Sequence, residues 1–210
     1  MTVKQLSNDI IEASLQPYSV TTTALLCDQI RTYVELLLRW NQKTSLTTVT
    51  DPNEILRFHF GESLLAVATV PIRHGRLADV GSGAGFPAVP IRMVSDEVSI
   101  ILIESNQKKA TFLAEVVREL RLSNVDVRRC RMEDAHFNGA RVDFVTARAV
   151  GIDEDFLNWS RDGLNPTGSL VLWLGDADVS RISQKARWNW SKPIRIPQSQ
   201  RRFILRGSKS

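Results

Sequence analysis

One short segment, residues 77–90 with the sequence LADVGSGAGFPAVP, restricts the fold of this chain more than any other. It begins as an apolar run that ends at Asp79. Three glycines then alternate with small residues, Gly81, Gly83 and Gly85. Such a turn between a strand and a helix start lets a ligand approach the main chain, because glycine accepts positive φ and has no side chain. Glu104 ends the next apolar run, where a ribose-binding acid is expected. The segment therefore predicts a site for a nucleoside-containing cofactor.

Downstream of this segment, strand-like and helical patterns alternate. The predicted strands span residues 77–80, 98–103, 125–130, 142–147 and 169–174. The predicted helices span residues 89–94, 107–122, 153–164 and 179–190. Strands separated by helices indicate βαβ units and a mainly parallel sheet. Two last strand-like runs, 194–196 and 202–206, have no helix between them and predict an antiparallel C-terminal hairpin. The expected fold class is α/β, a twisted sheet with flanking helices.

The first 65 residues carry a helical pattern instead. Apolar residues recur at short helical steps, at Leu25, Ile30, Val34, Leu37 and Leu38. The threonines at 21–23 can cap this helix, and Asp51 can cap a second helix with Pro52 at its first position. The second helix would turn four side chains toward a core, Ile55, Phe58, His59 and Leu64.

Length and composition suit one large domain with a small appendage, because 210 residues with 43% hydrophobic and 24% charged residues are ordinary for a folded globule. The change of pattern around Val70 and Pro71 places the boundary. We expect a helical extension at residues 1–70 and a cofactor-binding α/β domain at residues 71–210.

Cysteines and apolar runs indicate the compartment. Cys27 and Cys130 are far apart in the sequence, so we expect buried small side chains and neither a disulfide nor a metal site. No apolar run approaches the ~18 residues of a membrane span, and the N-terminal residues lack the apolar core of a signal peptide. A cytoplasmic protein with no membrane partner is expected.

The C-terminal tail is basic. No acidic residue follows Asp178. Nine cations do follow it, Arg181, Lys185, Arg187, Lys192, Arg195, Arg201, Arg202, Arg206 and Lys209. A tail of one sign would attract a phosphate backbone, although ordinary surface charge is the alternative. Trp188 and Trp190, placed on a helix end, could stack on bases or simply pack.

The glycine spacing distinguishes between nucleotide cofactors. The pattern is G-x-G-x-G, and Phe86 stands where a dinucleotide fold has its third glycine. A bulky ring there hinders a pyrophosphate but can pack against an adenosine or methionine group. S-adenosylmethionine has no phosphates, so the spacing favours this cofactor over a nicotinamide dinucleotide. The alternative is that the glycines serve only a tight turn.

Further positions are candidate cofactor contacts, besides Asp79, Gly81, Gly83, Gly85 and Phe86. The carboxylate of Glu104 can accept both ribose hydroxyls at once, although an acid also suits a helix start. Met132 and Glu133 follow the third predicted strand, where a loop could clasp adenine, or they are ordinary loop residues. Arg148 closes the fourth strand at the carboxyl edge of the sheet, where open α/β sheets bind ligands. It could hold the methionine carboxylate, an RNA phosphate or a surface acid.

Five segments carry a family resemblance: RWNQKTSLTTVTDPNEILRFHFGESL, LADVGSGAGFPAVPI, IESNQKKATFLAEVVREL, RRCRMEDA and FVTARAV. With them, nearly the full chain resembles the bacterial 16S rRNA guanine-N7 methyltransferase family (RsmG), also called glucose-inhibited division protein B. The prolines at 87 and 90 are unusual in other methyltransferases. The resemblance implies a Rossmann-like class I methyltransferase fold with an N-terminal helical extension, and methyl transfer to N7 of guanine-527 in 16S rRNA. It also implies cofactor contacts at Gly81, Phe86, Met132, Glu133 and Arg148.

The chain departs from the family pattern at several places. Ser45 replaces an asparagine before LT, residues 59–63 read HFGES instead of HxLDS, and Ala88 replaces a glycine. Leu174 stands before Gly175 where the fifth strand usually ends in lysine, and loss of that cation could weaken RNA engagement or cofactor orientation. Three functions stay open: an rRNA methyltransferase, which we favour, a methyltransferase for another substrate, and an RNA- or ribosome-binding module without turnover.

The chemistry of N7 methylation sets expectations for the site. Guanine N7 has a lone pair and no proton at neutral pH, so no general base is needed and alignment would supply most of the catalysis. No residue is assigned a catalytic role. Four residues are candidates for an RNA-facing rim, with packing or surface charge as the alternative: Arg57, His59, Arg201 and Arg202. The expected partner is 16S rRNA or the small ribosomal subunit, and a monomer is expected.

Overall fold

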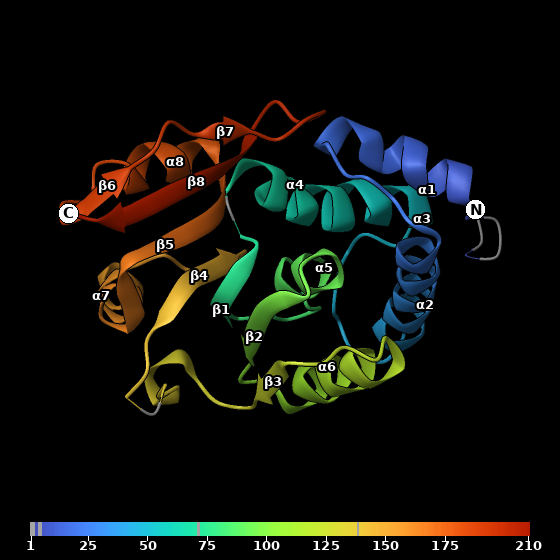
Figure 1. Cartoon of the computed structure of the whole chain (residues 1–210), viewed down its shortest axis with the longest axis horizontal. Coiled ribbons are helices and arrows are strands. Elements are labelled where there is room, and N and C mark those ends of the chain that lie inside the picture. The colour runs from blue at the N-terminus through green and yellow to red at the C-terminus, as the bar shows by residue number, and fades with distance from the viewer. Residues whose placement is uncertain (1–2, 4–5, 71, 138) are drawn as a thin grey trace.

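The computed structural model describes residues 3, 6–70, 72–137 and 139–210. Within them, eight strands form one sheet in the order β3-β2-β1-β4-β5-β8-β6, with β7 also paired to β8 (Figure 1). The bounds are β1 His74–Val80, β2 Glu97–Ile103, β3 Val125–Arg128, β4 Val142–Arg148, β5 Leu164–Gly175, β6 Trp188–Trp190, β7 Ile194–Arg195 and β8 Arg202–Lys209. Strands β1 to β5 are parallel, whereas β8 is antiparallel to β5, β6 and β7. The α/β fold class and the antiparallel C-terminal hairpin are thus confirmed.

Helices cover both faces of this sheet. Their bounds are α1 Asn8–Leu15, η2 Gln16–Tyr18, α2 Ala24–Asn41, α3 Pro52–Ile55, η3 Leu56–Gly61, α4 Glu62–Thr69, α5 Ala88–Val94, α6 Gln107–Glu119, η4 Met132–Asp134, α7 Glu154–Gly163 and α8 Asp176–Ile182. Successive strand residues point to opposite faces. Leu77 and Ile100 therefore join the core beneath α5 and α6, whereas Ala78 and Ile101 join the core beneath α7 and α8. Burial on both faces explains why the strands read as continuous apolar runs.

The strand order places a crevice at one edge of the sheet. β1 pairs with β2 on one side and with β4 on the other. The connections that leave β1 and β4 run in opposite directions across the sheet, and open α/β sheets bind ligands where this reversal occurs. The glycine segment follows β1 directly, so the fold brings it to this crevice.

The N-terminal helices share the core of the sheet. Buried side chains of α2 and α4, among them Ile30 and Leu64, belong to the same apolar cluster as Leu77 and Ile100 of the sheet. In Figure 1, α1, α2 and α4 lie beside α5 and α6 on one side of the molecule. The predicted division into residues 1–70 and 71–210 stays a prediction, and Pro71 lies outside the described residues.

The predicted helix starts are confirmed. The side chain of Thr23 accepts a hydrogen bond from the N–H of Leu26 at the start of α2, and the carboxylate of Asp51 caps α3 in the same way. The prediction that Leu25 joins the apolar face is wrong, because its side chain is 68% exposed. Leu26, four residues before Ile30, occupies the buried position instead, since a helical face repeats at three or four residues and not at five.

The predicted helix over residues 179–190 is wrong in its second half. α8 ends at Ile182, and Trp188–Trp190 forms strand β6 against β8. Arg187 has a φ of 72°, which no helix accommodates. The alternation of buried Trp188 with exposed Asn189 is the two-residue period of a strand.

Candidate active site

The three glycines of the β1–α5 turn have positive φ for different reasons. Their φ angles are 67° at Gly81, 55° at Gly83 and 85° at Gly85. A Cβ at Gly81 would lie 2.5 Å from Cγ1 of Val150, and a Cβ at Gly85 would overlap the hydroxyl of Tyr33. A Cβ at Gly83 would meet only the carbonyl oxygen of Gly81, at 3.6 Å. Gly81 and Gly85 are therefore closely packed, whereas Gly83 faces open space.

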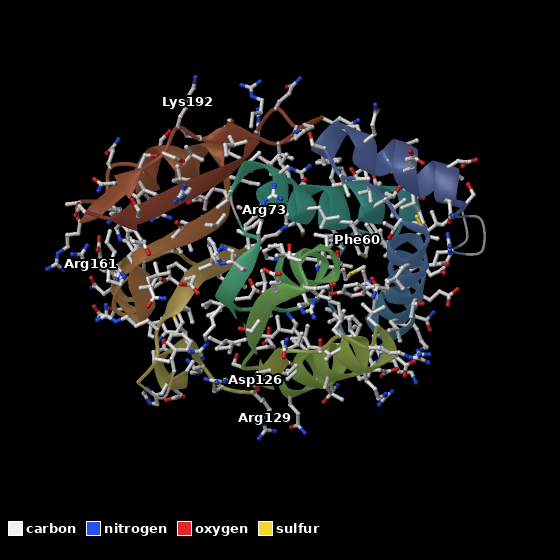
Figure 2. All side chains as sticks on the ribbon, in the orientation of Figure 1. Phe60, Arg73, Asp126, Arg129, Arg161 and Lys192 are labelled. Atoms are coloured by element: carbon white, nitrogen blue, oxygen red, sulfur yellow. The ribbon has the colours of Figure 1, made fainter. Side chains whose placement is uncertain are left out.

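A stack of aromatic rings fixes this turn from the side of the N-terminal helices. The Phe86 ring lies nearly parallel to the rings of Tyr33 and His59, with centroids 5.1 Å and 4.6 Å away. The hydroxyl of Tyr33 donates a 2.6 Å hydrogen bond to the carbonyl of Ala84. Phe60 packs edge-on against the rings of Tyr33 and Phe86, in the interior between α2 and α4 (Figure 2). The stack makes Phe86 a wall of the crevice, held in place from both sides.

Tyr33 was missed by the sequence analysis. Its position among the buried residues of α2 indicates only a core residue. Its contact with the turn depends on how α2 packs against the sheet, which no local pattern reports.

Glu104 follows β2 and holds the turn through the backbone. Its Oε2 accepts a 2.9 Å hydrogen bond from the N–H of Gly83, and its Oε1 accepts a 2.7 Å bond from the N–H of Asn106. The residue is 7% exposed. Each carboxylate oxygen has a second lone pair, so both can also accept a hydroxyl group. The predicted contact between Glu104 and ribose hydroxyls stays a prediction.

Asp79 lies one residue before the end of β1 and is buried. Its Oδ1 accepts a 2.6 Å hydrogen bond from Oγ1 of Thr146 on the neighbouring strand β4. Burial, with a smaller contribution from the charge of Glu104, raises the pKa of Asp79 to about 7, against the opposing effect of its hydrogen bonds. Asp79 thus ties β1 to β4 beneath the turn.

A cavity of about 520 Å³ opens where these elements meet, and in contrast to an adjoining cavity of about 310 Å³ we call it the larger cavity. Its lining comes from the end of α2 and the following loop, from the π-helix η3, from the glycine turn, and from the ends of α6 and β4: Asn41, Ser45, Leu46, Thr47, Thr48, His59, Gly81, Ser82, Gly83, Ala84, Phe86, Lys109, Arg148 and Ala149. Among these described residues, no carboxylate lines the cavity.

The larger cavity brings some predicted cofactor residues together and leaves others outside its lining. Gly81, Gly83, Phe86 and Arg148 line it. The predicted residues outside its lining are Asp79, Gly85, Glu104, Met132 and Glu133. Met132 is half-buried against the core and Glu133 is exposed, both in η4 after β3. Their contact with adenine stays a prediction.

The loop after α2 supplies lining residues that the sequence analysis did not select. The side-chain oxygen of Asn41 accepts hydrogen bonds from the N–H groups of Leu46 and Thr47, and its amide donates to the carbonyl of Thr47. Asparagine at a helix end is typical of such loop bonding, so this residue carried a usable signal.

His59 lies in the π-helix and faces the larger cavity. Its Nε2 is 2.8 Å from Oγ1 of Thr47, and its ring stacks on Phe86. Burial, and then the charge of Arg148, lowers the pKa of His59 to about 3. The imidazole is therefore neutral at physiological pH and is not a proton donor there. π-Helices are rare and often lie at functional sites.

A buried carboxylate joins two arginines beside this cavity. Oε2 of Glu62 is 3.3 Å from Nη2 of Arg148, and Oε1 is 2.7 Å from Nη1 of Arg202. Burial raises the pKa of Glu62 and lowers the pKa of Arg148, and the opposite charges in the cluster counteract both shifts. Glu62 was noted in the sequence only as a departure from a pattern, so its role as the partner of both arginines was missed.

The predicted RNA-facing residues divide between two places. The guanidinium groups of Arg57 and Arg202 lie 5.6 Å and 4.5 Å from the centroid of the Phe58 ring. Arg201 is exposed next to Arg202. His59, in contrast, lines the larger cavity. Whether any of the four contacts RNA stays a prediction.

The C-terminal tryptophans pack together. The rings of Trp188 and Trp190 stack with centroids 5.5 Å apart, and Nε1 of Trp190 donates to the carbonyl of Lys185. They also cover Gly207 of β8. These contacts favour the packing interpretation over base stacking.

Other chemistry can be checked within the described residues. No group of three or more His, Cys, Asp and Glu side chains among them could hold a metal ion. Cys27 is buried as predicted, whereas Cys130 is half-buried. Within the same ranges, every helix is too short or too polar to cross a membrane.

Solved structures share this fold. A SAM-dependent methyltransferase from Aquifex aeolicus superposes with a TM-score of 0.64 at 17% identity, covering 78% of this chain and 96% of that chain. The ribosomal protein L11 methylase from Lactobacillus delbrueckii subsp. bulgaricus superposes with a TM-score of 0.61 at 15% identity, covering 73% and 79%. These likenesses confirm the Rossmann-like methyltransferase fold.

Sequence comparisons are more specific. The family model described as rRNA small subunit methyltransferase G (GidB) matches residues 26–200. Relatives named ribosomal RNA small subunit methyltransferase G include one from Stutzerimonas stutzeri, 34% identical over 178 residues and 82% of each chain. Another, from Halorhodospira halophila, is 35% identical over 174 residues, 83% of this chain and 81% of that protein. A third, from Nitrosomonas eutropha, is 39% identical over 138 residues, 66% of this chain and 63% of that protein. With most of its length matched by this model and these relatives, the chain belongs to the rRNA small subunit methyltransferase G family.

Proposed function

We propose that this protein transfers the methyl group of S-adenosylmethionine to N7 of guanine-527 in the 16S rRNA of the small ribosomal subunit. Membership of the family supports methylation of small-subunit rRNA. The observation that carries the choice of N7 is the composition of the larger cavity, in which no described lining residue is a carboxylate and the one histidine has a pKa of about 3. The N7 lone pair needs no base to expose it, so such a site suits it.

The residues present fit the cofactor. A volume of about 520 Å³ lies within the ~300–1,000 Å³ of ligand pockets. Gly83 leaves its backbone open toward the cavity, and the Phe86 ring forms an apolar wall. Glu104 is outside the cavity lining but accepts the N–H of Gly83 and keeps lone pairs that could accept ribose hydroxyls, and Arg148 could pair with a carboxylate. S-adenosylmethionine would supply an electrophilic methyl group there.

The chain's own residues would act by alignment. The aromatic stack and the hydrogen bond from the Gly83 N–H to Glu104 hold the turn in place, so the entropic cost of positioning the reactants is met before the reaction. Neutral His59 keeps a like charge away from the cationic sulfur. We assign no residue a general-base role.

The RNA side would be the surface next to Arg202. Arg57 and Arg202 on the Phe58 ring, together with exposed Arg201, form a basic rim. Lys192 points outward from the same C-terminal part of the molecule (Figure 2). Cations of this kind neutralise phosphates and make binding salt-dependent. A ribosomal substrate would place the protein in the cytoplasm, and we expect it to act as a monomer.

The decisive experiment is methyl transfer from labelled S-adenosylmethionine to small ribosomal subunits and to naked 16S rRNA, with the modified base mapped. Label at N7 of guanine-527 is expected. Label on another base or molecule would contradict the proposed substrate. Binding of RNA and cofactor without transfer would favour an RNA-binding module. Thermal stabilisation by NAD but not by S-adenosylmethionine would overturn the cofactor.

A further inference from the structure

A second cavity adjoins the larger one. It has a volume of about 310 Å³, and we call it the smaller cavity. The two cavities share Arg148 and Ala149 in their linings. Three other lining residues are Glu62, Trp173 and Arg202. Its volume lies at the lower end of ligand pockets, so it suits a small planar group that reaches toward the larger cavity.

Two buried polar side chains at this cavity keep unused hydrogen-bonding capacity. Among the described residues, nothing hydrogen-bonds to Nη1 of Arg148, whereas Oε1 of Glu62 is 2.7 Å from Nη1 of Arg202 and keeps a second lone pair. Buried polar groups in folded proteins nearly always have partners, and an exception calls for an explanation. One atom is a donor and the other an acceptor, and their residues are joined by an ion pair. The pair therefore fits a ligand that presents an acceptor and a donor side by side.

Guanine presents this pattern. Its O6 accepts hydrogen bonds next to N7, and its N1–H and N2–H₂ groups donate beside O6. Adenine presents the opposite arrangement at the same two positions, a donor at N6 and an acceptor at N1. A carboxylate beside a guanidinium therefore distinguishes the two purines.

We propose that the smaller cavity holds the acceptor guanine, with Glu62 accepting hydrogen bonds from N1–H and N2–H₂ and Arg148 donating to O6. This assignment rests on the proposed function. Arg148 lines both cavities, and O6 is the neighbour of N7 on the purine. A base held in this way turns N7 toward the larger cavity.

Glu62 would also respond to the charge that the reaction creates. The N7 lone pair forms a bond to the methyl carbon, the carbon–sulfur bond pair returns to sulfur, and no proton moves. The positive charge passes from sulfur to the purine. A carboxylate at N1–H becomes a stronger partner as that charge develops, so it favours the transition state over the bound guanine.

The surroundings prepare Glu62 for this role. Nε1 of Trp173 donates a 2.8 Å hydrogen bond to the main-chain carbonyl of Glu62. Arg202 holds the carboxylate from the other side, and only 2% of the Glu62 side chain is exposed. A carboxylate fixed before binding needs little reorganisation in the reaction.

The test removes one functional group, the N2 amino group, from the substrate base. Inosine at position 527 keeps N7, O6 and N1–H but lacks the N2 amino group. We expect the unaltered protein to methylate guanine-527 RNA with a kcat/KM about tenfold or more above that of inosine-527 RNA, since a buried acceptor without its donor discriminates strongly. In Glu62→Leu, which has a similar volume and no acceptor, this ratio should fall toward one, whereas in Arg202→Gln both substrates should weaken together and the ratio should persist.

The outcomes separate the two proposals. Equal methylation of guanine and inosine by the unaltered protein would overturn the guanine assignment alone. An undiminished ratio in Glu62→Leu would overturn the role of Glu62. Absence of transfer to guanine-527 by the unaltered protein would overturn the proposed function, and the assignment with it. S-adenosylmethionine affinity, measured by calorimetry, reports whether Glu62→Leu folds; if it does not, the comparison of the two RNAs with the unaltered protein still decides.

Discussion

The two neighbouring cavities are built in opposite ways. The larger cavity is formed by main chain, hydroxyl groups and stacked rings, with no carboxylate among its described lining residues. The smaller cavity contains the buried carboxylate of Glu62 between two guanidinium groups. A larger side chain at a glycine would alter the shape of the larger cavity, whereas substitution or titration of Glu62 would alter the charge of the smaller cavity. On the proposed assignments, the cofactor and the guanine are bound by separate physical means, so variants should affect the binding of one without the other.

The largest effect is expected from Gly81→Arg. A side chain there meets Val150, which lines the smaller cavity, in a backbone conformation that favours glycine, so the turn that lines the larger cavity must shift. S-adenosylmethionine binding, measured by calorimetry, should fall below detection while RNA affinity changes less than about threefold. Gly83→Ala, whose added methyl group meets no side chain, is the matched control. It should still bind S-adenosylmethionine, although more weakly than the unaltered protein does. If Gly81→Arg lost RNA affinity as strongly as cofactor affinity, the two cavities would not act independently.

Tyr33→Phe tests whether the N-terminal helices maintain the larger cavity. The change removes the hydroxyl that donates to the carbonyl of Ala84 and keeps the ring stack. A buried carbonyl without a partner costs about 1–3 kcal/mol, so the free energy of unfolding should fall by this amount and cofactor affinity should weaken. Chemical denaturation and calorimetry measure the two effects. A variant with unchanged stability and affinity would show that ring packing alone holds the turn.

Two buried groups near the larger cavity should give opposite pH dependences of stability. Asp79 has a pKa raised from 3.8 to about 7, so its native state keeps a proton that the unfolded chain loses, and its contribution to stability falls as pH rises through that window. His59 has a pKa lowered from 6.5 to about 3, so its contribution rises between those values. Relative to the unaltered protein, Asp79→Asn should become more stable with rising pH and His59→Gln less stable.

Each slope should be at most about 1.4 kcal/mol per pH unit. Urea denaturation at pH values from 4 to 7 measures both differences. Two parallel curves would contradict the assignment of burial as the cause of both shifts.

Leu174→Lys should have the smallest effect on RNA affinity, because the added cation is buried and lowers the free energy of unfolding instead. Leu174 is 8% exposed and lines the smaller cavity, whose lining already includes Arg148 and Arg202. We expect RNA affinity, measured by anisotropy at several salt concentrations, to change less than about threefold, with the salt slope rising by about 0.7–0.9 at most. A rise in methylation rate of tenfold or more would indicate that this position lacks a cation that catalysis requires.

Much of the fold could be predicted from local sequence. The strand runs and the caps at Thr23 and Asp51 depend on neighbouring residues, and the structure confirms them. The region after α8 was mispredicted because Val179 and Ile182 continue a helical spacing, while Trp188 and Trp190 depend on pairing with β8. Pairing with a distant strand overrides local spacing.

The candidate site divides in the same way. The glycine turn and Glu104 lie in adjacent elements of one βαβ unit, so their closeness follows from the strand order. Tyr33 and Glu62 act on residues far along the chain, through contacts that only helix packing creates. Local sequence carries no record of those partners.

The π-helix η3 has a consequence for how the sequence can change. It joins α3 to α4 and places His59 at one cavity and Glu62 at the other. Residues of a π-helix bond at i→i+5 and not at i→i+4, so deletion of a single residue from this segment would change which side chains between α3 and α4 face the two cavities. Evolution can exchange amino acids along this helix more freely than it can lengthen or shorten it.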